Sequence, residues 1–250
     1  MPVMDEFKKE RAAVKNGTPK QKLSYFIYYY KWYVIAAVLV VAAVVSMIRH
    51  YANQKDIAFY ACFLNSAKGE NAEEYVQSFA DYAGIDTDTY AVCFDSSILI
   101  NDPNENPETL EASSQKLMVY IAAGNLDVLL TDANSIKHYA NAQLFCDMRD
   151  FLTPAQIKLY EPYFYYVDQT VVQELQESLT NPEQKYIPDY PDPTKPEEMD
   201  QPIPVGIWIE NPGALADNYA FLDGGLVLAV FPNAKNPEAA SKFIDFLMQQ

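Results

Sequence analysis

The longest uninterrupted apolar stretch of the chain lies near its N-terminus. From Trp32 to Ile48 the sequence reads WYVIAAVLVVAAVVSMI, without a charged residue. At about 1.5 Å per residue, an α-helix of this length covers about 26 Å, close to the roughly 30 Å hydrocarbon core of a bilayer. The pattern predicts a transmembrane helix over residues 25–49. The aromatic belt expected at its start comprises Tyr25, Phe26, Tyr28, Tyr29, Tyr30, Trp32 and Tyr33.

A buried core helix and a cleaved signal peptide are the two alternative interpretations of this segment. A buried core helix is rarely so uniformly apolar, and a signal peptide has a shorter apolar region and a small-residue cleavage site, which SMIRHYANQKD lacks. Seven basic residues precede the span, and only Arg49 and Lys55 follow it closely. By the positive-inside rule we expect a cytoplasmic tail over 1–24, a linker over 50–55 and an extracytoplasmic domain over 56–250 in the cell membrane.

Beyond the span, β-rich runs alternate with amphipathic segments. Strands are predicted over 56–65, 90–99 and 126–132, and the third is apolar enough to be covered on both faces. Helices are predicted between them over 71–84, with an Asn start and a Gly stop, and over 108–124. Strand, helix and strand in this order predict parallel pairing. The buried stripe of the second helix is expected to contain Leu110, Leu117, Met118 and Ile121.

The second half of the chain has a less regular pattern. Residues 132–152 fit a short helix capped by Asp132 or Asn134, and Thr153-Pro154 begins another. Residues 181–204 contain seven prolines and predict a loop instead of a packed element. The closing elements are the strands PVGIWIE and GGLVLAVF, a short helix near GALADNYAF, and a helix NPEAASKFIDFLMQQ capped by Asn236. The whole pattern predicts an α/β layered domain of about five strands with a mainly parallel sheet.

Charge excludes one class of partner. Residues 1–50 carry eight basic and three acidic side chains, so the remaining 200 residues hold 10 basic and 31 acidic ones. Phosphate binding depends on Lys and Arg, and a domain this acidic repels nucleic acid. We therefore expect no nucleic-acid partner.

The three cysteines lack the spacing of a zinc site. Cys62, Cys93 and Cys146 lie far apart in sequence, and an odd number cannot pair completely. They are interpreted as small apolar residues. A disulfide between Cys62 and Cys93 stays open, since both lie in predicted strands.

No catalytic motif stands out. His50 adjoins the apolar span and His138 is isolated in a predicted helix, so neither belongs to a metal-binding HExxH pattern or a readable Ser/His/Asp set. Ser113-x-x-Lys116 matches one element of penicillin-recognising enzymes, but the accompanying SDN and KTG are missing. The sequence predicts no enzyme, no cofactor and no metal site.

An aromatic cluster follows the second short helix. It consists of Tyr160, Tyr163, Phe164, Tyr165 and Tyr166. Such rings can stack on sugars, but they also build cores and partner surfaces. The sequence leaves these alternatives open.

Two stretches resemble a known family. SSQKLMVYIAAGNLDVLLTDANSIKHYANAQLFCDMRDFL, continued by TPAQIKLYEPYFYYVDQ, resembles the first lobe of extracellular solute-binding proteins of ABC importers, of the maltose-binding-like sugar group. GGLVLAVFPNAKNPEAASKFIDFLMQQ resembles the strand and helix that return to that lobe. The resemblance implies a periplasmic-binding-protein-like lobe that recognises a solute. Only the Pro-rich stretch and PIPVGIWIE stand where the family has its second lobe, so one wall of the family's cleft is missing.

A ligand site in such a fold is expected at the carboxyl ends of the parallel strands. The candidate ligand-binding residues are Asn65, Ser66, Asp95, Ser96, Ser97, Thr131 and Asp132. Helix capping explains Asp132 equally well.

The resulting hypothesis is a single-pass, membrane-anchored extracytoplasmic recognition domain without catalysis. Its partner would be a small solute such as a sugar or peptide. The alternative is a scaffold or assembly protein of a membrane complex, whose lobe no longer binds small solutes and whose partner is a membrane protein.

Overall fold

The chain divides into two compact units, Met1–Gln54 and Lys55–Gln250. The computed structural model describes residues 18–52, 55–100, 103, 105–180, 189–221 and 225–249. Most of the expected cytoplasmic tail, part of the expected linker and the first eight residues of the Pro-rich segment lie outside these ranges.

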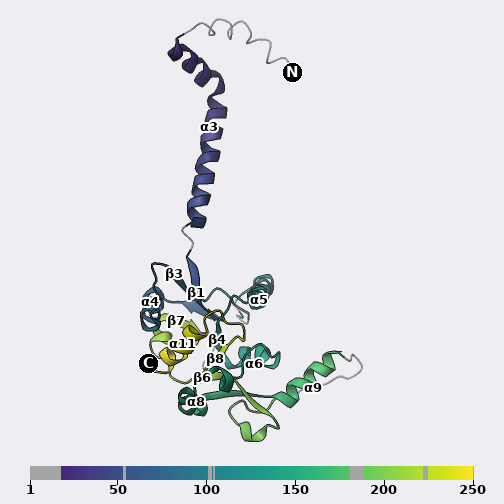
Figure 1. The fold of residues 1–250 in the computed structure, drawn as a ribbon. Coiled ribbons are helices and arrows are strands. Elements are labelled where there is room, and N and C mark those ends of the chain that lie inside the picture. Colours follow the sequence, from purple (N-terminus) through teal and green to yellow (C-terminus); the bar gives the residue numbers. More distant parts are fainter. Residues whose placement is uncertain are drawn as a thin grey trace. The chain divides into compact units, whose positions relative to one another are not determined.

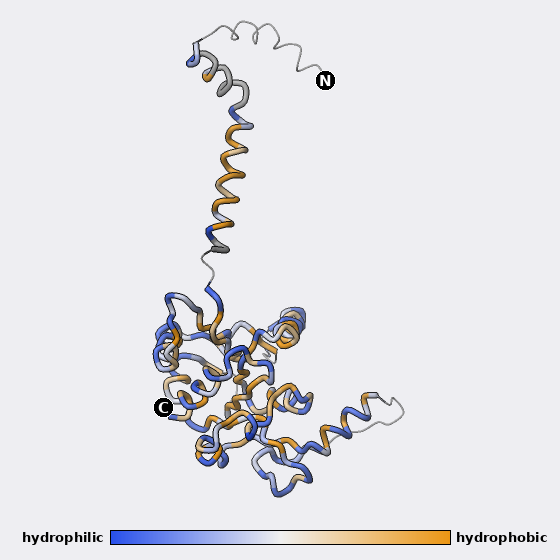
Figure 2. The backbone as a smooth tube through the Cα atoms, viewed as in Figure 1, coloured by the Kyte–Doolittle hydropathy of each residue, from blue (hydrophilic) through white to orange (hydrophobic). Residues whose placement is uncertain are grey.

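The described part of the first unit, residues 18–52, contains one long helix. Helix α3 (Pro19–Ala52) holds the apolar segment Lys31–Arg49, which is long and apolar enough to cross a membrane and has no buried residues. Figure 2 shows this segment as a hydrophobic stretch of the helix. Some signal sequences near an N-terminus also meet this criterion of length and apolar composition. The predicted N-terminal apolar helix is therefore present, and either role fits it.

The second unit is built on a six-stranded sheet in the order β3-β1-β4-β8-β6-β5. Its strands are β1 (Asp56–Phe63), β3 (Tyr90–Asp95), β4 (Val128–Asp132), β5 (Phe164–Asp168), β6 (Pro202–Ile209) and β8 (Leu226–Val230). Strands β3, β1 and β4 are parallel, as predicted, whereas β8 pairs antiparallel with both β4 and β6, and β6 with β5. The sheet is therefore mixed. A small antiparallel sheet joins β2 (Ser66–Lys68) to β7 (Tyr219–Phe221).

Helices cover both faces of the large sheet. They are α4 (Ala72–Ala83), α5 (Pro107–Ala122), α6 (Ala133–Asn141), α7 (Met148–Phe151), α8 (Pro154–Tyr160), α9 (Gln169–Thr180), α10 (Ala214–Asn218) and α11 (Pro237–Met248), with short 3₁₀ turns η1 (Glu161–Tyr163) and η2 (Pro196–Glu198). Helices α4 and α11 share one core cluster with the sheet, and α5 and α6 share another (Figure 1). The unit is thus an α/β domain of three layers.

Strand β4 lies in the middle of this arrangement. Val128 and Leu130 belong to the core cluster on one face, Leu129 belongs to the cluster on the other, and all three are fully buried. The prediction of a strand covered on both faces is confirmed.

Most helix boundaries follow the predicted capping signals. The Asp132 side chain caps α6, which resolves the choice between Asp132 and Asn134. Thr153 forms a capping box at α8, and Asn236 caps α11 ahead of Pro237. Gly84 ends α4 with a φ of 73°, a conformation that glycine adopts without strain. Local sequence therefore determines these helix ends.

Two expectations for the helices and strands were incomplete or wrong. Residues 164–180 form β5 and α9, which the sequence pattern did not resolve. Met118, expected on the buried stripe of α5, is 51% exposed, because α5 buries only Leu117 fully.

The open question of a disulfide is also answered. All three cysteines are free, Cys62 being buried and the other two half-buried. In the parallel register of β1 and β3, Cys62 lies beside Asp95 and Cys93 lies beside Tyr60, so the two thiols are not neighbours across the pair.

The second part of the Pro-rich segment is packed, in contrast to the expected free loop. The Tyr166 backbone N–H donates to the Pro193 carbonyl at 2.9 Å, which places the segment along the outer edge of β5. The Asp168 carboxylate accepts from the Asp200 backbone N–H at 2.8 Å. Met199 is buried, and residues 202–204 already belong to β6. Hydrogen bonds to the sheet edge therefore order this stretch.

A buried carboxylate connects the start of β4 to its surroundings. Asp127 is 2% exposed, and its Oδ2 accepts from the Tyr60 backbone N–H at 2.8 Å. Its Oδ1 accepts from the Asn236 backbone N–H at 3.0 Å, at the start of α11. Its carbonyl accepts from the Phe231 N–H, just after β8. Through its side chain and its backbone carbonyl, Asp127 thereby joins three segments that lie far apart in sequence.

We expect Asp127→Asn to destabilise the domain by about 2 kcal/mol, because the amide presents a donor group to a buried backbone N–H. Urea unfolding of the full-length chain in detergent micelles measures the loss. The matched control is Asp88→Asn, which changes an exposed carboxylate. Equal midpoints for the two variants would contradict this role of Asp127.

Candidate functional site

The seven predicted ligand-binding residues lie at the carboxyl ends of the three parallel strands. Asn65 and Ser66 follow β1, Asp95 to Ser97 end β3 and lead away from it, and Thr131 and Asp132 end β4. They do not form one site. The structure separates most of them into a buried network and a more exposed one.

The buried network centres on Asn65, which adopts a φ of 55°. Its Nδ2 donates to Ser135 Oγ at 2.9 Å and to Asp132 Oδ2 at 3.3 Å, while its Oδ1 accepts from the Ile100 backbone N–H at 2.7 Å. Thr131 Oγ1 donates to Asp132 Oδ2 at 3.3 Å. These contacts hold the loop after β3 against the start of α6. The polar groups of this network serve the fold.

Asp132 is the acceptor at the helix start. Its Oδ1 accepts from the backbone N–H groups of Asn134 at 3.0 Å and Ser135 at 2.9 Å. Burial opposes ionisation of Asp132, but hydrogen bonds from Ser135, Asn65 and Thr131 outweigh it, so its pKa is lowered. One oxygen of the carboxylate therefore caps α6, and the other accepts from Asn65 and Thr131.

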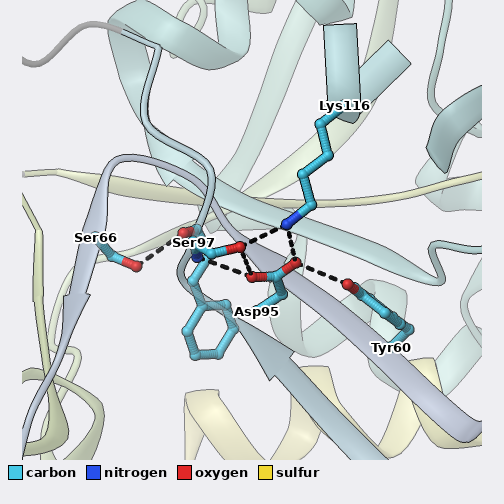
Figure 3. A network of polar contacts seen from close by, with 6 residues as sticks. Tyr60, Ser66, Asp95, Ser97 and Lys116 are labelled. Atoms are coloured by element: carbon cyan, nitrogen blue, oxygen red, sulfur yellow. Dashed lines mark hydrogen bonds and ion pairs between the residues drawn. The ribbon is translucent and has the colours of Figure 1, made fainter. Parts of the chain in front are cut away.

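The more exposed network centres on Asp95 (Figure 3). Its Oδ2 accepts from the Tyr60 hydroxyl at 2.7 Å and from Lys116 Nζ at 3.3 Å. Its Oδ1 accepts from the Ser97 backbone N–H at 2.8 Å and from the Ser97 hydroxyl. Lys116 Nζ also donates to Ser97 Oγ at 2.6 Å. Strand β1, the end of β3 and helix α5 thus meet at one carboxylate.

The remaining two candidates are placed differently. Ser66 is buried, and its hydroxyl donates to the Phe63 carbonyl at 2.8 Å (Figure 3). Ser96 is half-buried beside the exposed Ser97. Neither side chain joins the Asp95 network through a hydrogen bond that the structure defines.

The contact between Ser97 and Lys116 invites comparison with a nucleophile and its base. An amine activates a serine by accepting its proton, which requires a neutral amine. Here Lys116 forms an ion pair with Asp95, and the Ser97 hydroxyl donates to the same carboxylate. The geometry is that of an ion pair reinforced by a hydroxyl, in which Lys116 Nζ donates to Ser97 Oγ instead of accepting from it.

Metal binding has no evident ligand set. Among the described residues, no group of three or more His, Cys, Asp or Glu side chains lies close enough to hold a metal ion.

A groove with a volume of about 560 Å³ lies near the β5 end of the sheet, away from both networks. It is lined by Glu161, Pro162, Tyr163, Phe164, Tyr166, Thr194, Pro196, Trp208 and Glu210. Strand β6 runs parallel to β4, since both pair antiparallel with β8. Glu210 therefore follows the carboxyl end of a strand at the same sheet edge as Asp132.

The groove combines aromatic rings with carboxylates. Tyr163, Tyr166 and Trp208 are half-buried, whereas Glu161 and Glu210 are exposed. Burial raises the pKa of Tyr166, and the negative charge of Glu161 raises it further. Trp208 packs on Tyr165, with ring centroids 5.4 Å apart. Its indole Nε1 is buried and has no acceptor in the part of the chain that the structure describes.

The sequence contained a signal for this groove. Tyr163, Phe164 and Tyr166 belong to the aromatic cluster, and Glu210 ends the predicted strand PVGIWIE. Applying the carboxyl-end rule to that strand would have selected Glu210. The rule could not be applied, because the direction of this strand in the sheet depends on long-range pairing.

Comparison of the chain with protein-family models, with curated proteins and with solved structures returns no match. The function is therefore inferred from the chain's own geometry.

The Asp95 network predicts a pH dependence of stability. Burial opposes ionisation of Asp95, but hydrogen bonds from Ser97 and Tyr60 and the charge of Lys116 outweigh it, so its pKa is lowered. When the folded-state pKa of a carboxyl group is lowered, its ionised form stabilises the domain at pH values above the unfolded-state pKa of about 4. This contribution to the free energy of unfolding is lost as the pH falls further. Asp95→Asn should therefore lose less stability than the wild type between about pH 6 and pH 3.

Urea midpoints at the two pH values measure this difference, with Asp217→Asn, an exposed carboxylate, as the control. An acid sensitivity of Asp95→Asn equal to that of the wild type would show that the network does not stabilise the folded state.

Proposed function

We propose that this chain is a membrane-anchored, extracytoplasmic recognition protein that binds a small ligand without catalysis, in a lobe like that of a solute-binding protein. The observation that carries the proposal is the groove bordered by Tyr163, Tyr166, Trp208 and two glutamates. Its volume of about 560 Å³ is in the range of small-molecule sites. Aromatic side chains with a few polar groups are the usual lining of such sites.

The groove supports ligand binding better than the predicted residues at β3, β1 and β4 do. Asn65 and Asp132 hydrogen-bond to each other and to backbone groups, and Asp95 is surrounded by three donor side chains. A ligand at those positions would have to replace contacts that hold the loop and helix ends. The rings of the groove can receive a ligand without breaking such bonds.

The apolar helix supports the anchoring part of the proposal. Segment Lys31–Arg49 has the length and composition of a span, and seven basic residues precede the expected core of that span. Under the positive-inside rule this arrangement places the N-terminus in the cytoplasm and the α/β domain outside.

The scaffold alternative also has an observation in its favour. Helix α9 extends away from the sheet (Figure 1), and Val172 is its only fully buried residue among those described. Leu179 near its end is 77% exposed. A helix that contributes so little to the core is suited to contacts with another protein.

The anchor predicts that the full-length chain stays in the membrane. We expect carbonate-washed membranes to retain the uncleaved chain, and protease added to intact cells to digest the α/β domain, because the span is uncharged and the basic residues lie on the N-terminal side. Mass spectrometry of the retained chain measures its N-terminus. A soluble chain that begins after Arg49 would identify the helix as a signal sequence.

The groove predicts thermal stabilisation by a small ligand. For the full-length chain in detergent micelles, we expect at least one compound from a panel of sugars, amino acids, peptides and small organic cations to raise Tm by a few degrees near saturation. Circular dichroism measures the transition. Tyr163→Leu should abolish the shift, and Tyr82→Leu, at an exposed tyrosine outside the groove, should retain it.

A panel that leaves Tm unchanged would count against ligand binding and favour the scaffold alternative.

A further inference from the structure

Resting on the proposed function, we propose that the groove selects a small organic cation, of the quaternary or alkylated ammonium class, over neutral ligands of the same shape. Three features of the described residues lead to this assignment: the aromatic rings, the sign of the charges in the groove, and the way nearby basic groups are already paired.

The rings provide the first part of the site. Tyr163, Tyr166 and Trp208 border the groove from η1, β5 and β6. The two tyrosines pack against one core cluster and Trp208 packs against the other, so the lining comes from both faces of the sheet. The face of an aromatic ring carries negative potential and attracts a cation within about 6 Å of its centre. The chain forms such a contact in a different pocket, where Lys137 Nζ lies 4.4 Å from the ring centre of Tyr190.

The carboxylates provide the second part. Glu161 and Glu210 are acidic residues of the lining, and no Lys, Arg or His belongs to the part of the lining that the structure describes. The negative charge of Glu161 raises the pKa of Tyr166, and both residues border the groove. The rings and the carboxylates therefore favour the same sign of charge on a ligand. An anionic ligand would meet repulsion from both.

Two basic side chains near the groove pair with other carboxylates. The positive charge of Arg149 lowers the pKa of Tyr166, and Arg149 donates to both carboxylate oxygens of Asp147. Lys195, between the lining residues Thr194 and Pro196, pairs with Glu198 at 3.0 Å and with Asp192 at 3.9 Å. Neither cation is positioned to satisfy Glu161 or Glu210.

The net charge of the rest of the domain also favours a cationic ligand. Residues 51–250 hold 31 acidic and 10 basic side chains, so the field around the domain concentrates cations at its surface. A sugar would gain from stacking on the rings but not from this field. Charge thus distinguishes the proposed ligand from the neutral solutes that the same groove could accommodate by shape.

The two tryptophans of the chain make the test specific. Trp32 lies in α3 and Trp208 borders the groove, so the full-length W32F variant has Trp208 as its only fluorophore of this type. This variant, in detergent micelles at fixed ionic strength, is titrated with choline chloride. Parallel titrations use 3,3-dimethyl-1-butanol, the uncharged isostere of choline, as well as sodium chloride and maltose.

We expect a saturable change in Trp208 emission with choline. The isostere should bind about tenfold more weakly, because it lacks the charge that the rings and the carboxylates attract. Glu210→Gln should weaken choline binding by about the same factor and leave binding of the isostere unchanged. Glu197→Gln, on η2 but outside the lining, should bind both as W32F does.

Unchanged binding of the isostere by Glu210→Gln also shows that this variant keeps the groove folded. Equal affinity for choline and its isostere, or binding of maltose alone, would overturn the selection of cations while leaving ligand recognition in place. A response to sodium chloride equal to that of choline would overturn the selection as well. No response to any of these probes or to the wider panel would overturn both proposals.

Discussion

The buried strand β4 has a carboxylate at each of its ends, and each carboxylate needs hydrogen-bond donors. The fold depends on supplying these donors. Asp127 at its start accepts from the backbones of Tyr60 and Asn236, and Asp132 at its end accepts from the first N–H groups of α6. A buried carboxylate without such donors is strongly destabilising. Strand β1 and the starts of α6 and α11 must therefore occupy one arrangement around β4, and the apolar layers close over both of its faces.

This arrangement determines which polar side chains take part in holding the fold and which border the groove. At the carboxyl ends of β1 and β4, Asn65 and Asp132 are used to hold a loop and cap a helix. At the β5 end of the same sheet, the ordered Pro-rich segment and β6 border a groove whose rings and glutamates are not needed in this way. The proposed recognition site therefore lies beside the structural network.

Local sequence determined much of the fold. Apolar periodicity and capping residues are properties of short segments, and they located the apolar helix, the parallel strands β1, β3 and β4, and helices such as α11. The candidates at the strand ends were also brought to the expected edge, because parallel strands present their carboxyl ends together. Strand β5 and helix α9 were missed, since an aromatic run followed by an irregular pattern does not distinguish a strand from a core or a surface cluster.

By itself, the sequence determined the element types, the acidic charge of residues 51–250 and the presence of one apolar helix. Tertiary structure alone decided that Asp95 would pair with Lys116, that Asp127 would join three segments, and that the groove would form from residues 161–166, 194–196 and 208–210. The physical reason is that sheet order and strand direction arise from pairings between segments distant in sequence. No local pattern encodes which side chains those pairings bring together.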